Sequence, residues 1–394
     1  MKKLWIVGAT ILLLTVSAQT ALASTGMGGR AMGMGGAFTA VADDGTAAYW
    51  NPAGLTQVRF GLTPTLGALG EWGEFSKLQD KMREFEKVGS FTELKNLEIG
   101  KVEMMVNLGA GINFSHFAVN LFFDPNIYSR GLNEKNGELE GNVPMVASFS
   151  AAWEFTDLLG VGVNFKGVAL GRGFADYKTE DIMLDIGGQP KKIPLKAPNG
   201  EVKYGTGMGY LLDVGGLFKV SDRVRAGAVL RNIPLGGIKL EGKRSSTDTK
   251  FLQNKLEKYI IEEGSVDKAV ERLEKEIDQG QVDVLLTTDE DYTETYEPPT
   301  ILVVGGALKL PVTGTLIAAD YEVPISGRAE NSFHLGVEQP VLGVIFLRVG
   351  GYTADGDVRF TAGIGGKLGP VLLDLAAVQG EDSVGAFLTG GFRF

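Results

Sequence analysis

The feature that most constrains this chain is an alternation of side chains with a period of two residues. In the segment 143–156, for example, Met145, Ala147 and Phe149 alternate with Ser148 and Ser150. Such alternation is typical of a β-strand with one apolar and one polar face. Fourteen segments follow this pattern, at residues 58–70, 102–113, 115–125, 143–156, 159–172, 204–220, 223–233, 300–310, 313–323, 331–339, 343–352, 357–367, 370–379 and 384–394. The sequence therefore predicts an all-β protein.

A chain of such strands can fold in two ways. A soluble sandwich buries the apolar face, whereas a membrane barrel turns it toward lipid and keeps the polar face in the lumen. The connections favour the barrel, because every second one is short, as outer-membrane barrels require. The intervening connections include the stretches 71–101, 126–142, 173–203 and 234–299. We therefore expect a transmembrane antiparallel barrel of about fourteen strands over residues 58–394, with 71–101, 173–203 and 234–299 as external loops.

Charged residues agree with this orientation. The alternation places Arg359 and its neighbour Phe360 on opposite faces of one strand. It does the same for Glu338 and its neighbour Val337 in another strand. A charge that faces lipid at mid-depth costs about 2–4 kcal/mol, whereas a charge in a wet lumen costs little. The lipid bilayer is thus an expected partner of the apolar rows.

The N-terminus predicts export. Lys2 and Lys3 precede an apolar run that is shorter than a membrane span, and Ala23 ends a small-residue cleavage site, so residues 1–23 read as a signal peptide. An exported barrel implies the outer membrane of a diderm bacterium. The formal net charge of -10 argues against a nucleic acid partner.

Residues 24–57 do not alternate. The segment is rich in Gly and Ala, and Asp43-Asp44 and Asn51-Pro52 are turn signals. The lumen of a fourteen-stranded barrel is wider than that of an eight-stranded one, which side chains can fill. We therefore expect residues 24–57 to fold back as a plug inside the lumen.

The run GRAMGMGGAFTAVADDGTAAYWNPAGL resembles the N-terminal signature of the outer-membrane long-chain fatty-acid transporter family, the FadL/TodX type. The resemblance implies a hatch inside a fourteen-stranded barrel, which gates the passive diffusion of a hydrophobic ligand such as a fatty acid. Phe394 is similar to the terminal aromatic residue that outer-membrane assembly machinery reads. The hatch residues that the resemblance singles out are Asp43, Asp44, Asn51, Pro52, Ala53 and Gly54.

The resemblance also implies a route for the ligand. It would land between the third and fourth external loops, 173–203 and 234–299, enter the barrel, and leave sideways through a kink in the third strand. In this chain Asp124-Pro125 marks that kink. The alternative is that Pro125 simply ends the strand, since proline lacks the N–H that a ladder needs.

Two external loops carry helical periodicity. One pattern begins at Phe75, and the other comprises Leu252, Leu256, Tyr259 and Ile260. These apolar residues could form a landing groove for the ligand, or the helices could pack on each other and cap the barrel. Both arrangements give the same sequence pattern.

Two other functions stay open. The glycine-rich GMGMGG run is similar to a sister group of the PorV type, whose barrels shuttle secreted proteins, and a plain polar-solute porin is the third alternative. An enzyme is not expected, because His116 and His334 have no recognisable nucleophile near them. The sequence has no Cys and two widely separated His, so no metal or other cofactor is expected.

Overall fold

The structure is a computed structural model of the chain. It describes residues 26–77, 79–80, 98–133, 136–185, 190–246, 249–278, 288–327, 329–354 and 356–393. The predicted signal peptide 1–23 and Phe394 lie outside these residues. None of the helices within the described ranges is long and apolar enough to cross a membrane.

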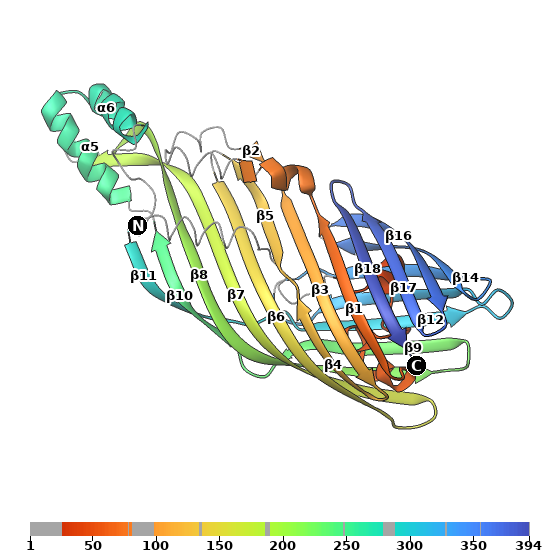
Figure 1. Ribbon diagram of the computed structural model, residues 1–394. Coiled ribbons are helices and arrows are strands. Elements are labelled where there is room, and N and C mark those ends of the chain that lie inside the picture. Colours follow the sequence, from red (N-terminus) through yellow and green to blue (C-terminus); the bar gives the residue numbers. More distant parts are fainter. Residues whose placement is uncertain are drawn as a thin grey trace.

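The chain forms one antiparallel sheet that closes into a barrel (Figure 1). Strand β1 pairs with β3 on one side and with β18 on the other, so no free edge is left at this seam. The strands are β1 (Gly61–Gly70), β2 (Glu98–Ile99), β3 (Val102–Phe114), β4 (Phe117–Phe123), β5 (Asn126–Asn133), β6 (Asn136–Glu154), β7 (Leu159–Asp185), β8 (Pro190–Lys219), β9 (Val224–Pro234), β10 (Ile238–Ser246), β11 (Thr288–Tyr296), β12 (Ile301–Lys309), β13 (Leu316–Pro324), β14 (Ser332–Val341), β15 (Ile345–Ala354), β16 (Asp357–Leu368), β17 (Val371–Gln379) and β18 (Val384–Arg393).

The eighteen strands occupy fourteen positions around the barrel. Strands β4 and β5 share one position between β3 and β6. Strands β9 and β10 share the position beside β8, and β11 and β12 share the next one. Strand β2 has two residues and pairs with the end of β5, so it adds no further position to the barrel. The predicted strand number is confirmed.

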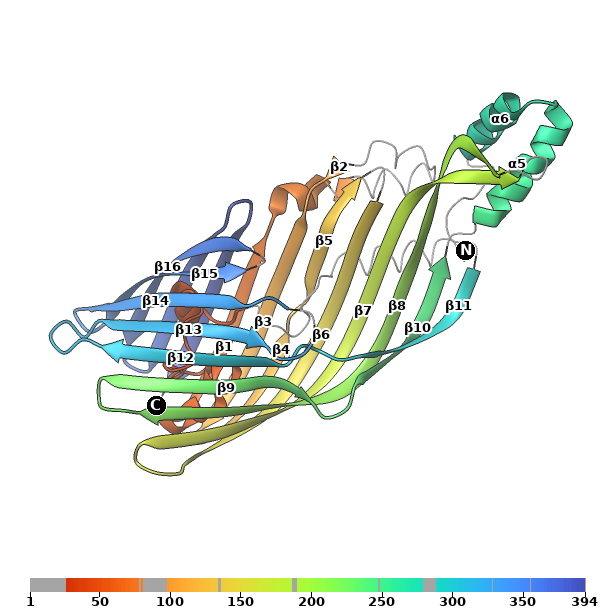
Figure 2. The same ribbon diagram turned by 180° about the vertical axis from the view of Figure 1, so that it is seen from behind.

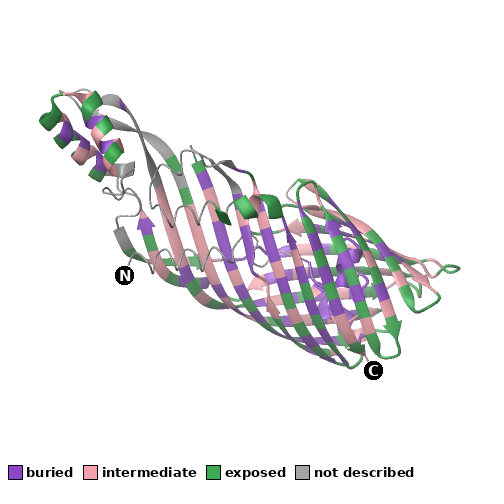
Figure 3. Ribbon diagram, turned by 45° about the horizontal axis from the view of Figure 1, so that its top comes forward, coloured by how far each residue is buried: buried purple, intermediate pink, exposed green. Residues whose placement is uncertain are grey.

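The two faces of the strands are also as predicted. On β17, Leu373 and Leu375 are 57% and 48% exposed, whereas Asp374 and Ala376 are 8% and 1% exposed. Figure 3 shows the same alternation as stripes along the strands. The apolar rows therefore face outward and the ionic rows face the interior, which is the orientation of a membrane barrel and not of a sandwich.

The short connections lie at one end of the barrel and the long connections lie at the other. Short turns join β6 to β7, β8 to β9 and β16 to β17. The other end carries the helices α5 (Thr249–Glu263) and α6 (Val266–Asp278) (Figure 1). Residues 72–77 are helical, and most of the remainder of the loop 71–101, including most of the helical pattern that begins at Phe75, lies outside the described residues.

The predicted loops 173–203 and 234–299 were too long. Strand β7 continues to Asp185 and β8 begins at Pro190, so the first stretch is mostly a hairpin. The second contains β10 and β11 besides the two helices. Beyond the lipid a strand no longer needs an apolar row, so the alternation fades while the backbone pairing continues.

Candidate functional site: the barrel interior

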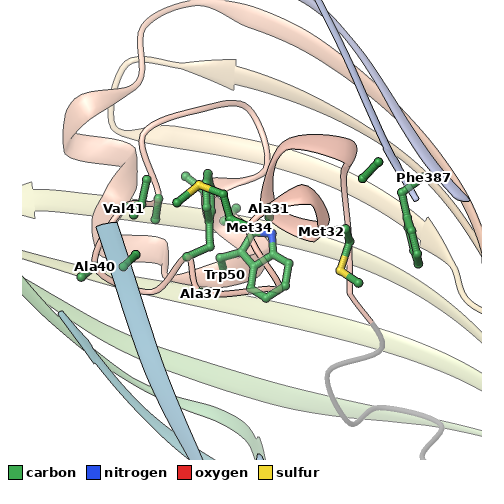
Figure 4. Packing of buried hydrophobic residues seen from close by; sticks show 14 of the residues in the cluster. Ala31, Met32, Met34, Ala37, Ala40, Val41, Trp50 and Phe387 are labelled. Atoms are coloured by element: carbon green, nitrogen blue, oxygen red, sulfur yellow. The ribbon is translucent and has the colours of Figure 1, made fainter. Parts of the chain in front are cut away.

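Residues 26–57, called the inner segment below, lie inside the ring of strands (Figures 2 and 4). The segment forms the helices α2 (Gly29–Gly33) and α3 (Ala47–Trp50) and the 3-10 helix η1 (Pro52–Gln57). A tight turn after α2 has φ of 63° and 77° at Gly35 and Gly36, which glycine adopts without steric cost. The apolar side chains of the segment pack on small wall residues in one buried cluster, which includes Met32, Met34, Phe38, Trp50, Leu55, Ala118, Ala152, Ala307, Ala318 and Ala376.

Asn51, one of the predicted hatch residues, ties the segment to itself and to the wall. Its Nδ2 donates to the carbonyl oxygens of Thr39 (2.9 Å) and Gly216 on β8 (3.0 Å). Its Oδ1 accepts from the backbone N–H of Ala53 (3.1 Å) and so caps η1, in which Pro52 takes the first position. The fully buried amide thus has its donors and its acceptor satisfied.

The other predicted hatch residues stabilise turns. Asp44 accepts from the backbone N–H and the hydroxyl of Thr46 (2.8 and 2.6 Å). Gly54 packs on the backbone, since a Cβ there would lie 2.0 Å from the carbonyl oxygen of Ala42. The structure therefore brings all six residues together in the inner segment. Their role in gating stays a prediction.

A buried ionic network joins the segment to the barrel. Arg30 forms ion pairs with Asp43 (2.5 Å) in the segment and with Glu338 (2.8 Å) on β14. Arg348 on β15 then pairs with Glu338 and with Asp374 on β17, both at 2.7 Å. Removing one member of such a network strands a buried charge, so the network holds the segment in one position.

Polar wall residues also satisfy the backbone of the segment. The Asp320 carboxylate accepts from the N–H groups of Phe38 (2.8 Å) and Thr39 (2.7 Å). His334 Nδ1 donates to the carbonyl oxygen of Gly35 (2.7 Å), and Arg231 donates to that of Trp50 (2.9 Å). His334 thus has a structural bond to the segment.

A second region, which the sequence analysis missed, is an apolar surface on the inner wall. Met208 and Tyr210 on β8 alternate with buried residues of this surface and are 78% and 57% exposed on the outside of the barrel. The buried residues therefore face the interior. The loss of alternation in Val168-Ala169-Leu170 and Leu211-Leu212 is a signal that could have revealed it. We call this surface the inner apolar patch, and it consists of Val146, Val168, Leu170, Leu211, Ile238 and Leu240 with Phe122 and Tyr296 beside them.

The patch ends in a charged cavity on the side of the long connections. The cavity has a volume of about 200 Å³ and includes Leu240 of the patch in its wall. Arg172 pairs there with Glu140 (2.8 Å) and Glu294 (3.5 Å). The other lining residues are Glu138, Phe174, Lys203 and Tyr292.

The third barrel strand is interrupted at Asp124-Pro125, where β4 ends and β5 begins. Leu108 pairs with Phe123 before the break and Met105 pairs with Asn126 after it, so the register is unchanged. The Pro125 carbonyl oxygen accepts from the N–H of Val106 (2.9 Å), and the Asp124 N–H donates to Pro144 (3.2 Å). Pro125 therefore does not end the strand, and an opening at this kink would have to break these two bonds. The lateral opening stays a prediction.

The predicted groove residues lie between two helices. Leu252, Leu256 and Tyr259 of α5 are buried in a cluster with α6, and Ile260 is partly buried against it. Outside this cluster, Ile261 is 83% exposed. A groove on the predicted residues would thus require the helices to separate, and the landing role stays a prediction.

Glu71 directly follows β1 and is 7% exposed. Burial and the nearby Glu103 carboxylate raise the pKa of Glu71 from 4.5 to about 7, against the opposing effects of Lys101 and Arg359. Protonation of this carboxyl therefore occurs near neutral pH and favours the folded barrel.

We expect the contribution of Glu71 to stability to be fully present below pH 4.5 and to be lost as the pH rises through about 7. The free energy of unfolding should fall by about 1–2 kcal/mol over this range after allowance for solvent screening. Urea unfolding in phospholipid vesicles, followed across this range, measures the change. The Glu71→Gln variant should lack it, and identical pH profiles for both proteins would contradict the assignment.

Comparisons with known proteins identify the fold. No family model matches the sequence. No curated protein matches it either.

Solved structures match nearly the whole chain. The toluene transporter TbuX of Ralstonia pickettii is 15% identical, with a TM-score of 0.57 over 94% of this chain and 98% of that chain. The monoaromatic hydrocarbon channel CymD is 13% identical, with a TM-score of 0.57 over 95% and 99% of the two chains. A FadL homologue of Pseudomonas aeruginosa is 11% identical, with a TM-score of 0.57 over 94% and 99%. The chain thus has the fourteen-stranded barrel fold of these transporter and channel proteins.

Proposed function

We propose that this protein is a passive outer-membrane transporter for hydrophobic small molecules and that the inner segment is its hatch. The observation that carries the proposal is the inner apolar patch, because it is an apolar cluster of the inner wall separate from the cluster that the inner segment forms with the wall. A pore for polar solutes has no use for such a surface. The patch lies between a charged cavity and a lumen that the inner segment occupies, as expected for a binding site in front of a hatch.

Two substrate classes fit this interior. The structural neighbours include a toluene transporter and a monoaromatic hydrocarbon channel, and small aromatic hydrocarbons match the apolar patch. Long-chain fatty acids match it as well, and their carboxylate would compete with Glu140 and Glu294 for Arg172 in the adjoining cavity. In both cases burial of apolar surface supplies the affinity.

The proposed route runs from the charged cavity along the inner apolar patch to the inner segment. Binding shifts the turn around Asn51-Pro52, and the ligand leaves through the kink at Asp124-Pro125 into the lipid. The kink suits this role because Pro125 has no N–H to donate to a neighbouring strand; between the strands, the N–H groups of Val106 and Asp124 donate there. Diffusion down a gradient needs no energy source and no cofactor.

The experiment is an uptake assay with radiolabelled toluene and hexadecanoate in a diderm strain that lacks this protein. Re-expression of the full chain should restore uptake, and Leu240→Asn should reduce it about tenfold, because an amide buried without a partner costs roughly 1–3 kcal/mol. Lys239→Asn is the matched control, since Lys239 is the outward-facing neighbour on β10.

Unchanged uptake in the deletion strain would reject the transport function. Loss of a surface protein from that strain, with normal uptake, would favour a barrel of the PorV type. A large permanent conductance of the full-length protein would favour a polar-solute porin.

A further inference from the structure

Buried amide and carboxyl groups gather on the inner face of the wall at the strand break. Asn107 on β3 and Asp124 face each other, because Leu108 pairs with Phe123 and Met105 with Asn126 on either side of them. The next rung pairs Asn126 with Asn142 of β6. These residues share the lumen face, since the outward Leu108 and Leu121 beside them are 43% and 63% exposed while Asn107 and Asn142 are 0% exposed.

Asn107 is fully buried, and within the described part of the chain neither its Nδ2 nor its Oδ1 has a hydrogen-bond partner. Because both atoms lack partners, the orientation of the amide does not matter. Asn126 is 5% exposed, and its Nδ2 donates to the Asp124 carbonyl oxygen (3.2 Å), while its Oδ1 has no partner in that same part of the structure. Native proteins rarely leave such groups unsatisfied, and each one is costly to bury.

Another lumenal amide shows the contrast. Asn120 lies on the same face of β4, two rungs from Asp124, and its Nδ2 donates to the Ser148 hydroxyl (3.2 Å). Asn51 is likewise satisfied on both sides of its amide. Single buried atoms such as Thr65 Oγ1 and Asn113 Oδ1 also lack a partner elsewhere, but among the described residues Asn107 is the one buried amide with neither end paired.

The amides adjoin the inner apolar patch. Phe122 and Val146, which pair directly across β4 and β6, occupy the rung next to Asp124 on the same face. A ligand whose apolar body lies on the patch would therefore bring one end to Asn107 and Asn126.

We propose that Asn107 and Asn126 form a hydrogen-bonding subsite for the hydroxyl end of an otherwise apolar ligand, such as a long-chain alcohol or an alkylphenol. The subsite offers two acceptor oxygens and one NH2 donor, and a hydroxyl both donates and accepts. A carboxylate has no proton to donate and would meet the nearby Asp124. This inference rests on the proposed transport function and names a preference within it.

The test compares uptake of octane, 1-octanol and octanoate by cells of a diderm host that express the full chain. We expect the protein to accelerate 1-octanol uptake more than octane uptake. Asn107→Leu, which keeps the side-chain size, should lower the ratio of 1-octanol to octane uptake about tenfold and leave octane uptake unchanged or higher. Asn126→Leu should also lower the ratio of 1-octanol to octane uptake. This second variant provides the test if Asn107→Leu does not fold.

Asn120→Leu is the matched control and should keep the wild-type ratio, because that amide is already paired with Ser148. Folding of each variant is checked by its migration on unheated gels. A wild-type ratio in both Asn107→Leu and Asn126→Leu, or a preference for octanoate over 1-octanol, would overturn the subsite alone. If octane uptake does not exceed that of cells without the protein, the transport function fails and the subsite fails with it.

Discussion

Deletion of residues 26–57 should convert the protein into an open pore. The inner segment packs its apolar side chains on the alanines of the wall and fixes its backbone to Asp320, His334 and Arg231. A barrel of fourteen strands is too wide for its own side chains to fill, so its lumen should admit water and small ions once the segment is removed. We expect conductance in planar bilayers to rise by at least about tenfold over the full-length protein.

The barrel itself should survive this deletion. Glu338 loses Arg30 as a partner but keeps Arg348, which also pairs with Asp374, and a wet lumen solvates the charges that remain. The variant keeps residues 1–25, which include the predicted signal peptide 1–23, and joins Thr25 to Val58. A folded barrel with the conductance of the full-length protein would show that the segment does not close the lumen.

The second expected result concerns the fit between the segment and the wall. At Gly215 on β8, an added Cβ would lie 2.1 Å from Asn51 Oδ1 and 3.0 Å from the Pro52 ring. Gly215→Val should therefore displace the Asn51-Pro52 turn and break the bonds of Asn51. Overpacking of this kind costs about 1–3 kcal/mol, and the loss of the cap on η1 adds about 1 kcal/mol.

Protease sensitivity of residues 26–57 and conductance in bilayers measure the displacement, and both should increase. Gly216→Val is an unusually close control, because the adjacent glycine has no atom within 4 Å of the position of an added Cβ and keeps the carbonyl that accepts from Asn51. If both variants behave alike, the inner segment is not held by this contact.

The barrel could be predicted from the sequence because the alternation that reveals each strand lies within that strand. Leu373, Asp374 and Leu375 reveal the two faces of β17 without reference to any other strand, and the short turns fix which ends lie together. The inner segment could also be predicted, since a glycine-rich run with turn signals and no alternation has few other places in such a fold.

The contacts inside the lumen could not be predicted in this way. Arg30 and Glu338 are separated by 308 positions along the chain. Neither residue alone indicates that it forms an ion pair with the other. The inner apolar patch is drawn from β6, β7, β8 and β10, so no single strand displays it. Asn107 looks like any lumenal amide until the register places it beside the break.

The length of β7 and β8 has a consequence for where the protein meets its surroundings. These strands have 27 and 30 residues, whereas a tilted strand needs only about 9–11 residues to cross the hydrocarbon. At about 3.3 Å per residue, the excess amounts to tens of ångströms of paired backbone. Helix α5, which contacts both strands, is carried at their far end (Figure 1). The tallest part of the wall thus holds α5 tens of ångströms beyond the hydrocarbon, in the aqueous layer next to the bilayer.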